Sequence, residues 1–195
     1  MTEELYISGK GLVPVILSMP GKAMGGKVAG VEIGVCRGDN MRYLLEHCPN
    51  IEFMWGIDPY TPYQDGVGIG GQDQAMCDDF KAQAIKNLEP FTKEVSKEWP
   101  HPRASLIFNS SAAEAPNWDP GSIDFVYVDG NHLPEYVLQD FRLWYPIVAP
   151  GGLISGHDFG VPGVRQALEI FIKEIGISWD QIMEVENSSW YFWKP

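Results

Sequence analysis

Cysteine is scarce in this chain. Its 195 residues include three cysteines, Cys36, Cys48 and Cys77, an odd number with no CxxC pair. This pattern argues against a disulfide scaffold and against a cysteine-ligated zinc site, and it fits a reducing compartment. A cytoplasmic protein is therefore expected.

Long apolar runs are also missing. The purely apolar stretches have the length of a strand, far below the ~20 residues that a helix needs to cross a bilayer. The opening residues, MTEELYISGK, lack the basic segment and apolar core of a secretion signal. Neither membrane insertion nor export is therefore expected.

Positive charge is the third shortage. The chain has 14 Lys and Arg against 26 Asp and Glu, and its formal net charge is -12. Such a charge repels polyphosphate, and the basic residues are scattered rather than gathered into a stripe. We expect no nucleic-acid partner and a small-molecule substrate instead.

The chain contains no internal repeat or linker-like stretch, so a single domain over residues 1–195 is expected. After an N-terminal helical extension, residues 1–27, β-branched runs alternate five times with helical patterns. Helical spacing in two of these patterns predicts the buried faces Met41, Leu44, Leu45 and Cys48, and Met76, Phe80, Ile85 and Leu88.

This alternation predicts an α/β fold with a Rossmann-like, doubly wound and mostly parallel sheet. The stretch APGG at 149–152 is predicted to separate a helix from the fifth strand, LISG. Residues 181–185 and 190–194, joined by ENSS, predict a C-terminal antiparallel hairpin that completes seven strands. Ligands of such sheets bind outside the carboxyl ends of the strands.

A glycine turn follows the first predicted strand. The stretch VEIGVCRG places Gly34 and Gly38 in a G-x-x-x-G spacing, where the backbone can approach a ligand closely. The fingerprint G-x-G-x-x-G is absent, which argues against a nicotinamide dehydrogenase. Glu32 favours a neighbouring amine or sulfonium over a pyrophosphate. Asp58 ends the second strand, where acidic residues accept hydrogen bonds from a ribose diol.

Four motifs in order carry a resemblance to a known family: VEIGVCRGDN, GIDPY, SIDFVYVDGNH and GGLISGHDF. Together they resemble the class I S-adenosylmethionine-dependent methyltransferases, and more narrowly the macrocin O-methyltransferase and cephalosporin-hydroxylase-like group. The resemblance covers about residues 28–159. It implies S-adenosyl-L-methionine as cofactor and O-methylation of a small-molecule hydroxyl, of sugar or secondary-metabolite type.

The resemblance also implies roles for particular residues. Glu32 would contact the methionine part of the cofactor, and Gly34 and Gly38 would form the turn beside it. Asp58 would bind the ribose. The stretch NSSAAEA after the third strand would lie against the adenine, with Ser110 and Ser111 as candidates.

Charged groups gather at the ends of the fourth and fifth predicted strands. Asp129 and His132 follow the fourth strand, and His157 and Asp158 follow the fifth. Carboxylates and an imidazole that converge on one point favour a cation between them. Mg²⁺ suits such oxygen-rich ligands best, and the imidazole leaves Mn²⁺ or Fe²⁺ open. By resemblance to metal-dependent O-methyltransferases, the ligands would be Asp129, His157 and Asp158.

The predicted catalytic residues are Asp129 and His132. Many members of the family carry Asp-Gly-Asp where this chain has Asp-Gly-Asn, and Asn131 cannot abstract a proton. His132 is therefore the predicted base. The alternative is a catalytically silent protein of the same fold that binds S-adenosylmethionine or a nucleoside. The glycine-rich residues 60–75 are predicted to form a lid, and a homo-oligomer stays open.

Overall fold

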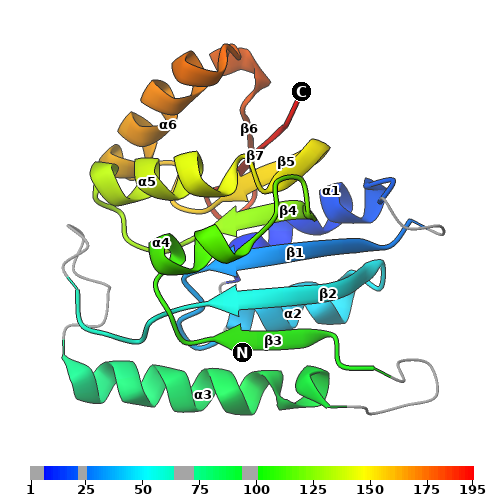
Figure 1. Cartoon of the computed structure of the whole chain (residues 1–195), viewed down its shortest axis with the longest axis vertical. Coiled ribbons are helices and arrows are strands. Elements are labelled where there is room, and N and C mark those ends of the chain that lie inside the picture. Colours follow the sequence, from blue (N-terminus) through cyan, green and yellow to red (C-terminus); the bar gives the residue numbers. More distant parts are fainter. Residues whose placement is uncertain (1–6, 22–25, 64–72, 94–100) are drawn as a thin grey trace, which may run out of the picture.

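The computed structural model describes residues 7–21, 26–63, 73–93 and 101–195. Strands and helices alternate along the chain as Figure 1 shows. The elements are η1 (Ser8–Leu12), α1 (Val13–Ser18), β1 (Val28–Ile33), α2 (Asp39–His47), β2 (Ile51–Ile57), α3 (Gln74–Thr92), β3 (Ala104–Ile107), α4 (Ser111–Glu114), η2 (Ala115–Asn117), β4 (Ile123–Val128), α5 (Pro134–Trp144), β5 (Val148–Gly156), α6 (Pro162–Ile175), η3 (Trp179–Gln181), β6 (Met183–Val185) and β7 (Ser189–Trp193).

All seven strands belong to one sheet, in the order β3-β2-β1-β4-β5-β7-β6. The first five strands in this order are parallel to one another, and β7 runs antiparallel to both β5 and β6. The arrowheads of β1 to β4 point to the same side in Figure 1. The predicted doubly wound sheet with a C-terminal antiparallel hairpin is therefore confirmed.

Helices cover both faces of the sheet, so the strands are buried between two apolar cores. One core lies under α5 and α6, where Phe141 and Trp144 pack against the strands. The other lies under α1, α2 and α3 and contains Leu12, Met41 and Leu88. Within the described ranges, no helix combines the length and apolarity needed to span a bilayer.

Two details of the predicted elements were wrong. Strand β5 begins at Val148 and includes the APGG stretch, because Val148 pairs with Ile123 before a shift of register. On α3 the buried residues are Cys77, Ala84 and Leu88, whereas Met76 and Ile85 are exposed. The predicted face of α2 is confirmed, since Met41, Leu44 and Leu45 are buried, as is Cys48 directly after the helix.

The N-terminal extension predicted for residues 1–27 contains η1 and α1. Its residues 1–6 and 22–25 lie outside the described residues. The predicted lid, residues 60–75, falls mostly on 64–72, which also lie outside them. Within it, Tyr60 is buried and α3 begins at Gln74.

Arg103 joins α2 to β2 from inside the protein. It is 7% exposed, and its guanidinium donates to the carbonyls of Leu45 at 3.0 Å, Cys48 at 3.2 Å and Ile51 at 2.7 Å. These carbonyls belong to the end of a helix and the start of a strand, where intrahelical partners run out. Arg103 therefore satisfies acceptors that would otherwise be buried without a donor.

We expect Arg103→Met to lower the free energy of unfolding by roughly 2–3 kcal/mol, because methionine fills similar space and leaves buried carbonyls without donors. Urea denaturation would measure the change. The exposed Arg42, which pairs with Glu46 on α2, gives the control Arg42→Met, with an expected change below about 0.5 kcal/mol. Equal midpoints for the two variants would contradict this role.

Candidate active site

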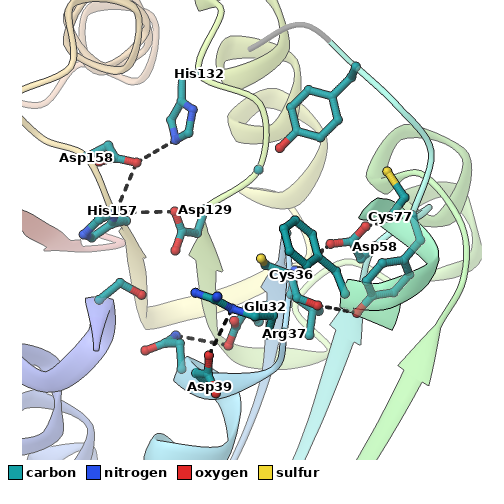
Figure 2. Close-up of a pocket in the computed structure, with 18 of the residues that line it drawn as sticks. Glu32, Cys36, Arg37, Asp39, Asp58, Cys77, Asp129, His132, His157 and Asp158 are labelled. Carbon is teal, nitrogen blue, oxygen red and sulfur yellow. Dashed lines mark hydrogen bonds and ion pairs between the residues drawn. The ribbon is translucent and has the colours of Figure 1, made fainter. Parts of the chain in front are cut away.

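A cavity of about 420 Å³ opens at the carboxyl ends of the central strands (Figure 2). Segments far apart in the sequence form its walls: the N-terminal segment, the turn after β1, the ends of β2, β4 and β5, and the start of α3. Its volume lies in the range of small-molecule and cofactor sites. The lining residues predicted from the sequence are Glu32, Gly34, Asp58, Asp129, His132, His157 and Asp158.

The glycine turn brings the end of β1 against the end of β4. Gly34 has a φ of +84°, and a Cβ built there would lie 2.2 Å from the carbonyl oxygen of Asp129. Only glycine fits this approach. Gly38 has a φ of +77° and caps α2, but it is not among the described residues that line the cavity. Gly34 therefore sets how close the turn comes to Asp129.

Glu32 lies at the floor of the cavity with 1% of its surface exposed. Its Oε2 accepts a hydrogen bond of 3.1 Å from Nδ2 of Asn40. Burial and the nearby charge of Asp129 raise the pKa of Glu32 well above its usual range, and the Asn40 bond only partly offsets them. A cation bound beside Glu32 would favour its charged form.

The carboxylate of Asp58 accepts hydrogen bonds from the backbone of the glycine turn. Its Oδ2 accepts from the backbone N–H groups of Val35 and Cys36, each at 3.0 Å, and its Oδ1 accepts from that of Tyr60 at 2.8 Å. Burial raises the pKa of Asp58, while these three bonds act against the rise. The carboxylate thus fixes the turn, and it still lines the cavity.

Ser110 and Ser111 have other partners in the structure. The hydroxyl of Ser110 accepts from the backbone of Ala113 and caps α4, and Ser111 donates to the buried carboxylate of Asp140. Neither serine belongs to the described cavity lining. Their assignment to adenine stays a prediction.

Two carboxylates and two imidazoles meet where β4 and β5 end (Figure 2). His132 Nε2 lies 2.6 Å from Asp158 Oδ2. His157 Nδ1 lies 3.1 Å from the same oxygen and 3.5 Å from Asp129 Oδ1. Asp129, His132 and Asp158 each offer one ligand atom, and these three atoms lie within 4.8 Å of one another. This donor set fits a divalent cation.

His157 is oriented by the hairpin between β6 and β7. Its Nε2 lies 2.7 Å from the backbone carbonyl of Asn187, which can only accept, so Nε2 carries a proton and Nδ1 faces the carboxylates. The sequence predicted His157 as a ligand and His132 as a base. In the structure both rings contact Asp158, and His132 joins the candidate ligands.

The charges in this cluster stabilise one another. Burial by itself would lower the pKa of His157, but the contacts with Asp129 and Asp158 raise it to about 11. Burial likewise opposes ionisation of Asp158, but the two histidines lower the pKa of this carboxyl well below its usual range. In the absence of a metal ion, a protonated His157 therefore supplies the positive charge between the carboxylates.

Three of the five described non-glycine residues with positive φ line the cavity. Cys36, Tyr60 and Asp158 have positive φ angles of 50°, 49° and 57°, and all three line it. Non-glycine residues in this conformation cost free energy, and they cluster at functional sites. The strain supports a site whose residues are held for chemistry rather than for packing.

The sequence did not reveal every wall of the cavity. Ile7 and Ser8 line it from the N-terminal segment, and Arg37, Asn40 and Phe80 line it from the turn and the helices. The C-terminal hairpin holds the first of these segments, because Asn187 Nδ2 donates to the carbonyl of Ile7 at 2.9 Å and Ser189 donates to that of Ser8. No local pattern indicates such contacts between the two ends of a chain.

Comparison with known proteins decides the family. Residues 31–159 match the methyltransferase domain family, and this segment contains the glycine turn and both strand ends that carry the charged cluster. The chain belongs to this methyltransferase family. It is a class I S-adenosylmethionine-dependent methyltransferase domain, so the predicted resemblance is confirmed and S-adenosylmethionine is its cofactor.

Solved structures agree with this methyltransferase fold. The O-methyltransferase NovP superposes with a TM-score of 0.63 at 16% identity, over 93% of this chain and 78% of NovP. The calicheamicin methyltransferase CalS11 gives the same TM-score and identity, over 93% of this chain and 75% of CalS11. Spermidine synthase from Thermotoga maritima reaches 0.58 at 14% identity, over 95% of this chain and 58% of that protein.

Among curated proteins, the methyltransferase domain is similar to an uncharacterized protein of Acanthamoeba polyphaga mimivirus. The two are 26% identical over 130 residues, which is 66% of this chain. The match covers 50% of the viral protein, so the chain spans about half the length of this relative.

Proposed function

We propose that this methyltransferase domain transfers the methyl group of S-adenosylmethionine to a hydroxyl of a small molecule, with assistance from a divalent cation. The observation that carries the proposal is the cluster of Asp129, His132, His157 and Asp158 in the same cavity as the glycine turn. The structural similarity to NovP, an O-methyltransferase, and to CalS11, a calicheamicin methyltransferase, supports a small hydroxylated acceptor.

The cofactor would bind between the glycine turn and the charged cluster. Gly34 would allow the backbone to approach the cofactor closely, and the buried Glu32 would face its positively charged end. A carboxylate has about four lone-pair sites for hydrogen bonds, and three on Asp58 accept from the backbone. The remaining site would accept a hydrogen bond from a ribose hydroxyl. In this arrangement the sulfonium would lie near Asp129.

Asp129, His157 and Asp158 would hold the cation, since His157 Nδ1 faces both carboxylates, and His132 would serve as the base. When bound, a divalent cation makes a hydroxyl group more acidic and so easier to deprotonate near neutral pH. Mg²⁺ is the preferred ion, and Mn²⁺ or Fe²⁺ would also accept an imidazole ligand.

His132 would take the proton from the acceptor hydroxyl. Asp158 orients this ring through the 2.6 Å contact with Nε2, in the manner of carboxylates that fix catalytic imidazoles. In the neutral ring a proton on Nε2 leaves Nδ1 as the basic nitrogen, and because Nδ1 is buried, the ring would have to turn toward the acceptor to reach its hydroxyl. The acceptor oxygen then bonds to the methyl carbon as the carbon–sulfur bond breaks, and S-adenosylhomocysteine leaves.

One observation favours a second candidate, a domain that binds the cofactor without turnover. Asn131, which replaces the acidic residue of many relatives, accepts a hydrogen bond of 2.9 Å from the backbone N–H of Leu133 through its Oδ1. This bond turns the chain into α5 and requires no acid. The Asn131 side chain therefore has a structural role in this domain.

The experiment that separates the two candidates measures S-adenosylhomocysteine release with a panel of sugar, catechol and macrolide acceptors. We expect release that falls at least tenfold with EDTA and returns with Mg²⁺ or Mn²⁺. Calorimetry with S-adenosylhomocysteine should show binding in both conditions. Tight binding with no release for any acceptor or metal would favour the silent domain.

A further inference from the structure

The cavity has an unbalanced set of charges. Five carboxyl side chains line it, those of Glu32, Asp39, Asp58, Asp129 and Asp158. Among its described lining residues, Arg37 is the sole lysine or arginine. The imidazoles of His132 and His157 are both turned to Asp158. Arg37 is therefore the side-chain cation of the described lining that is available to an anionic group of a ligand.

S-adenosylmethionine brings such a group. Its amino-acid end carries an α-ammonium, which the carboxylates attract, and an α-carboxylate, which they repel. In this acidic cavity the α-carboxylate needs a positively charged partner. The guanidinium group of arginine binds carboxylates through two parallel hydrogen bonds.

The position of Arg37 in the chain fits a contact with the α-carboxylate. It belongs to the turn between Gly34 and Gly38, immediately before α2, where the methionine end of the cofactor is expected. Its Nε lies 3.5 Å from Asp39 Oδ2 (Figure 2). Its Cζ lies 5.9 Å from the centre of the Phe80 ring. The contact with Asp39 uses Nε, so the two terminal nitrogens can meet a ligand.

The pair with Asp39 does not by itself explain the arginine. The Arg37 side chain is 54% exposed, and exposed ion pairs contribute little to stability. A purely structural role would therefore predict no effect of this side chain on the choice between ligands.

We propose that Arg37 binds the α-carboxylate of S-adenosylmethionine and so makes the site selective for the complete cofactor over its decarboxylated form. The inference rests on the proposed placement of the cofactor beside the glycine turn. It makes Arg37 a specificity-determining residue of this domain.

The test compares two ligands that differ by this one carboxylate. Calorimetry would measure the affinity of S-adenosylmethionine and of decarboxylated S-adenosylmethionine for the wild-type chain, for Arg37→Met and for the control Arg42→Met on the outer face of α2. We expect Arg37→Met to weaken S-adenosylmethionine roughly 10- to 100-fold and to change the decarboxylated ligand less than about twofold. Arg42→Met should change neither.

If Arg37→Met lowers the affinity for both ligands equally, or for neither, the assignment of Arg37 is overturned. The proposed position of the cofactor is not affected by either result. A wild-type chain that binds neither ligand would overturn the placement of the cofactor as well. An unchanged melting temperature in Arg37→Met would establish that the affinities refer to a folded protein. Arg37→Lys should retain part of the preference, because it keeps the charge but loses the two-pronged geometry.

Discussion

Asp158→Asn is expected to lower methyl transfer by roughly 10³-fold while leaving the affinity for S-adenosylhomocysteine within about threefold of wild type. Asp158 Oδ2 contacts His132 at 2.6 Å and His157 at 3.1 Å, so one carboxylate orients both rings and is also a candidate ligand. Asparagine keeps its shape and tolerates the positive φ of 57° at this position. The loss would therefore report on charge rather than on folding.

Metal binding and a control variant test this prediction separately from turnover. Electron paramagnetic resonance with Mn²⁺ would detect loss of metal binding independently of turnover, and the exposed Asp180 of η3 gives the matched variant Asp180→Asn, which should change neither quantity. Normal Mn²⁺ affinity in Asp158→Asn would remove this residue from the metal site. Normal turnover would remove it from the mechanism.

Gly34→Ala is expected to lower the free energy of unfolding by roughly 3–5 kcal/mol and to abolish cofactor binding. Part of this loss comes from the left-handed backbone, which costs about 1–2 kcal/mol for alanine. The larger part comes from the Cβ, which would lie 2.2 Å from the carbonyl oxygen of Asp129 and would force β1 and β4 apart. Urea denaturation and calorimetry with S-adenosylhomocysteine would measure both effects.

A second glycine separates the two contributions. Gly176, at the end of α6, has a φ of +73°, and a Cβ there would meet nothing within 4 Å. Gly176→Ala should therefore carry the backbone cost alone and leave cofactor affinity unchanged. If the two variants lose similar amounts of unfolding free energy, the close contact of a Cβ at position 34 with Asp129 does not contribute to the loss.

The parts of this protein that follow from local pattern could be predicted from the sequence. The apolar spacing in α2 predicted Met41, Leu44 and Leu45 as buried residues, because a helix repeats its faces every 3.6 residues. Strand order brought the motifs at Gly34, Asp58, Asp129 and Asp158 to one edge of the sheet, and the structure places all four around one cavity.

Other features depend on contacts between distant residues. Asp58 was predicted as a ribose ligand, but its bonds to Val35 and Cys36 depend on the path of a turn more than 20 positions earlier. The orientation of His157 depends on a hairpin carbonyl 30 residues away. The face of α3 was misjudged at Met76 and Ile85 because apolar side chains there match helical spacing but point to solvent.

The contacts of Ile7 and Ser8 with the β6–β7 hairpin bear on how this domain is made. Residues 180 or 181 positions apart must meet before that wall of the cavity stands, and β7 must first insert between β5 and β6. During synthesis Ile7 and Ser8 leave the ribosome long before the hairpin residues that hold them. The cofactor pocket would then close only after the β6–β7 hairpin is in place, and a fragment that stops before this hairpin would have the glycine turn without a closed pocket around it.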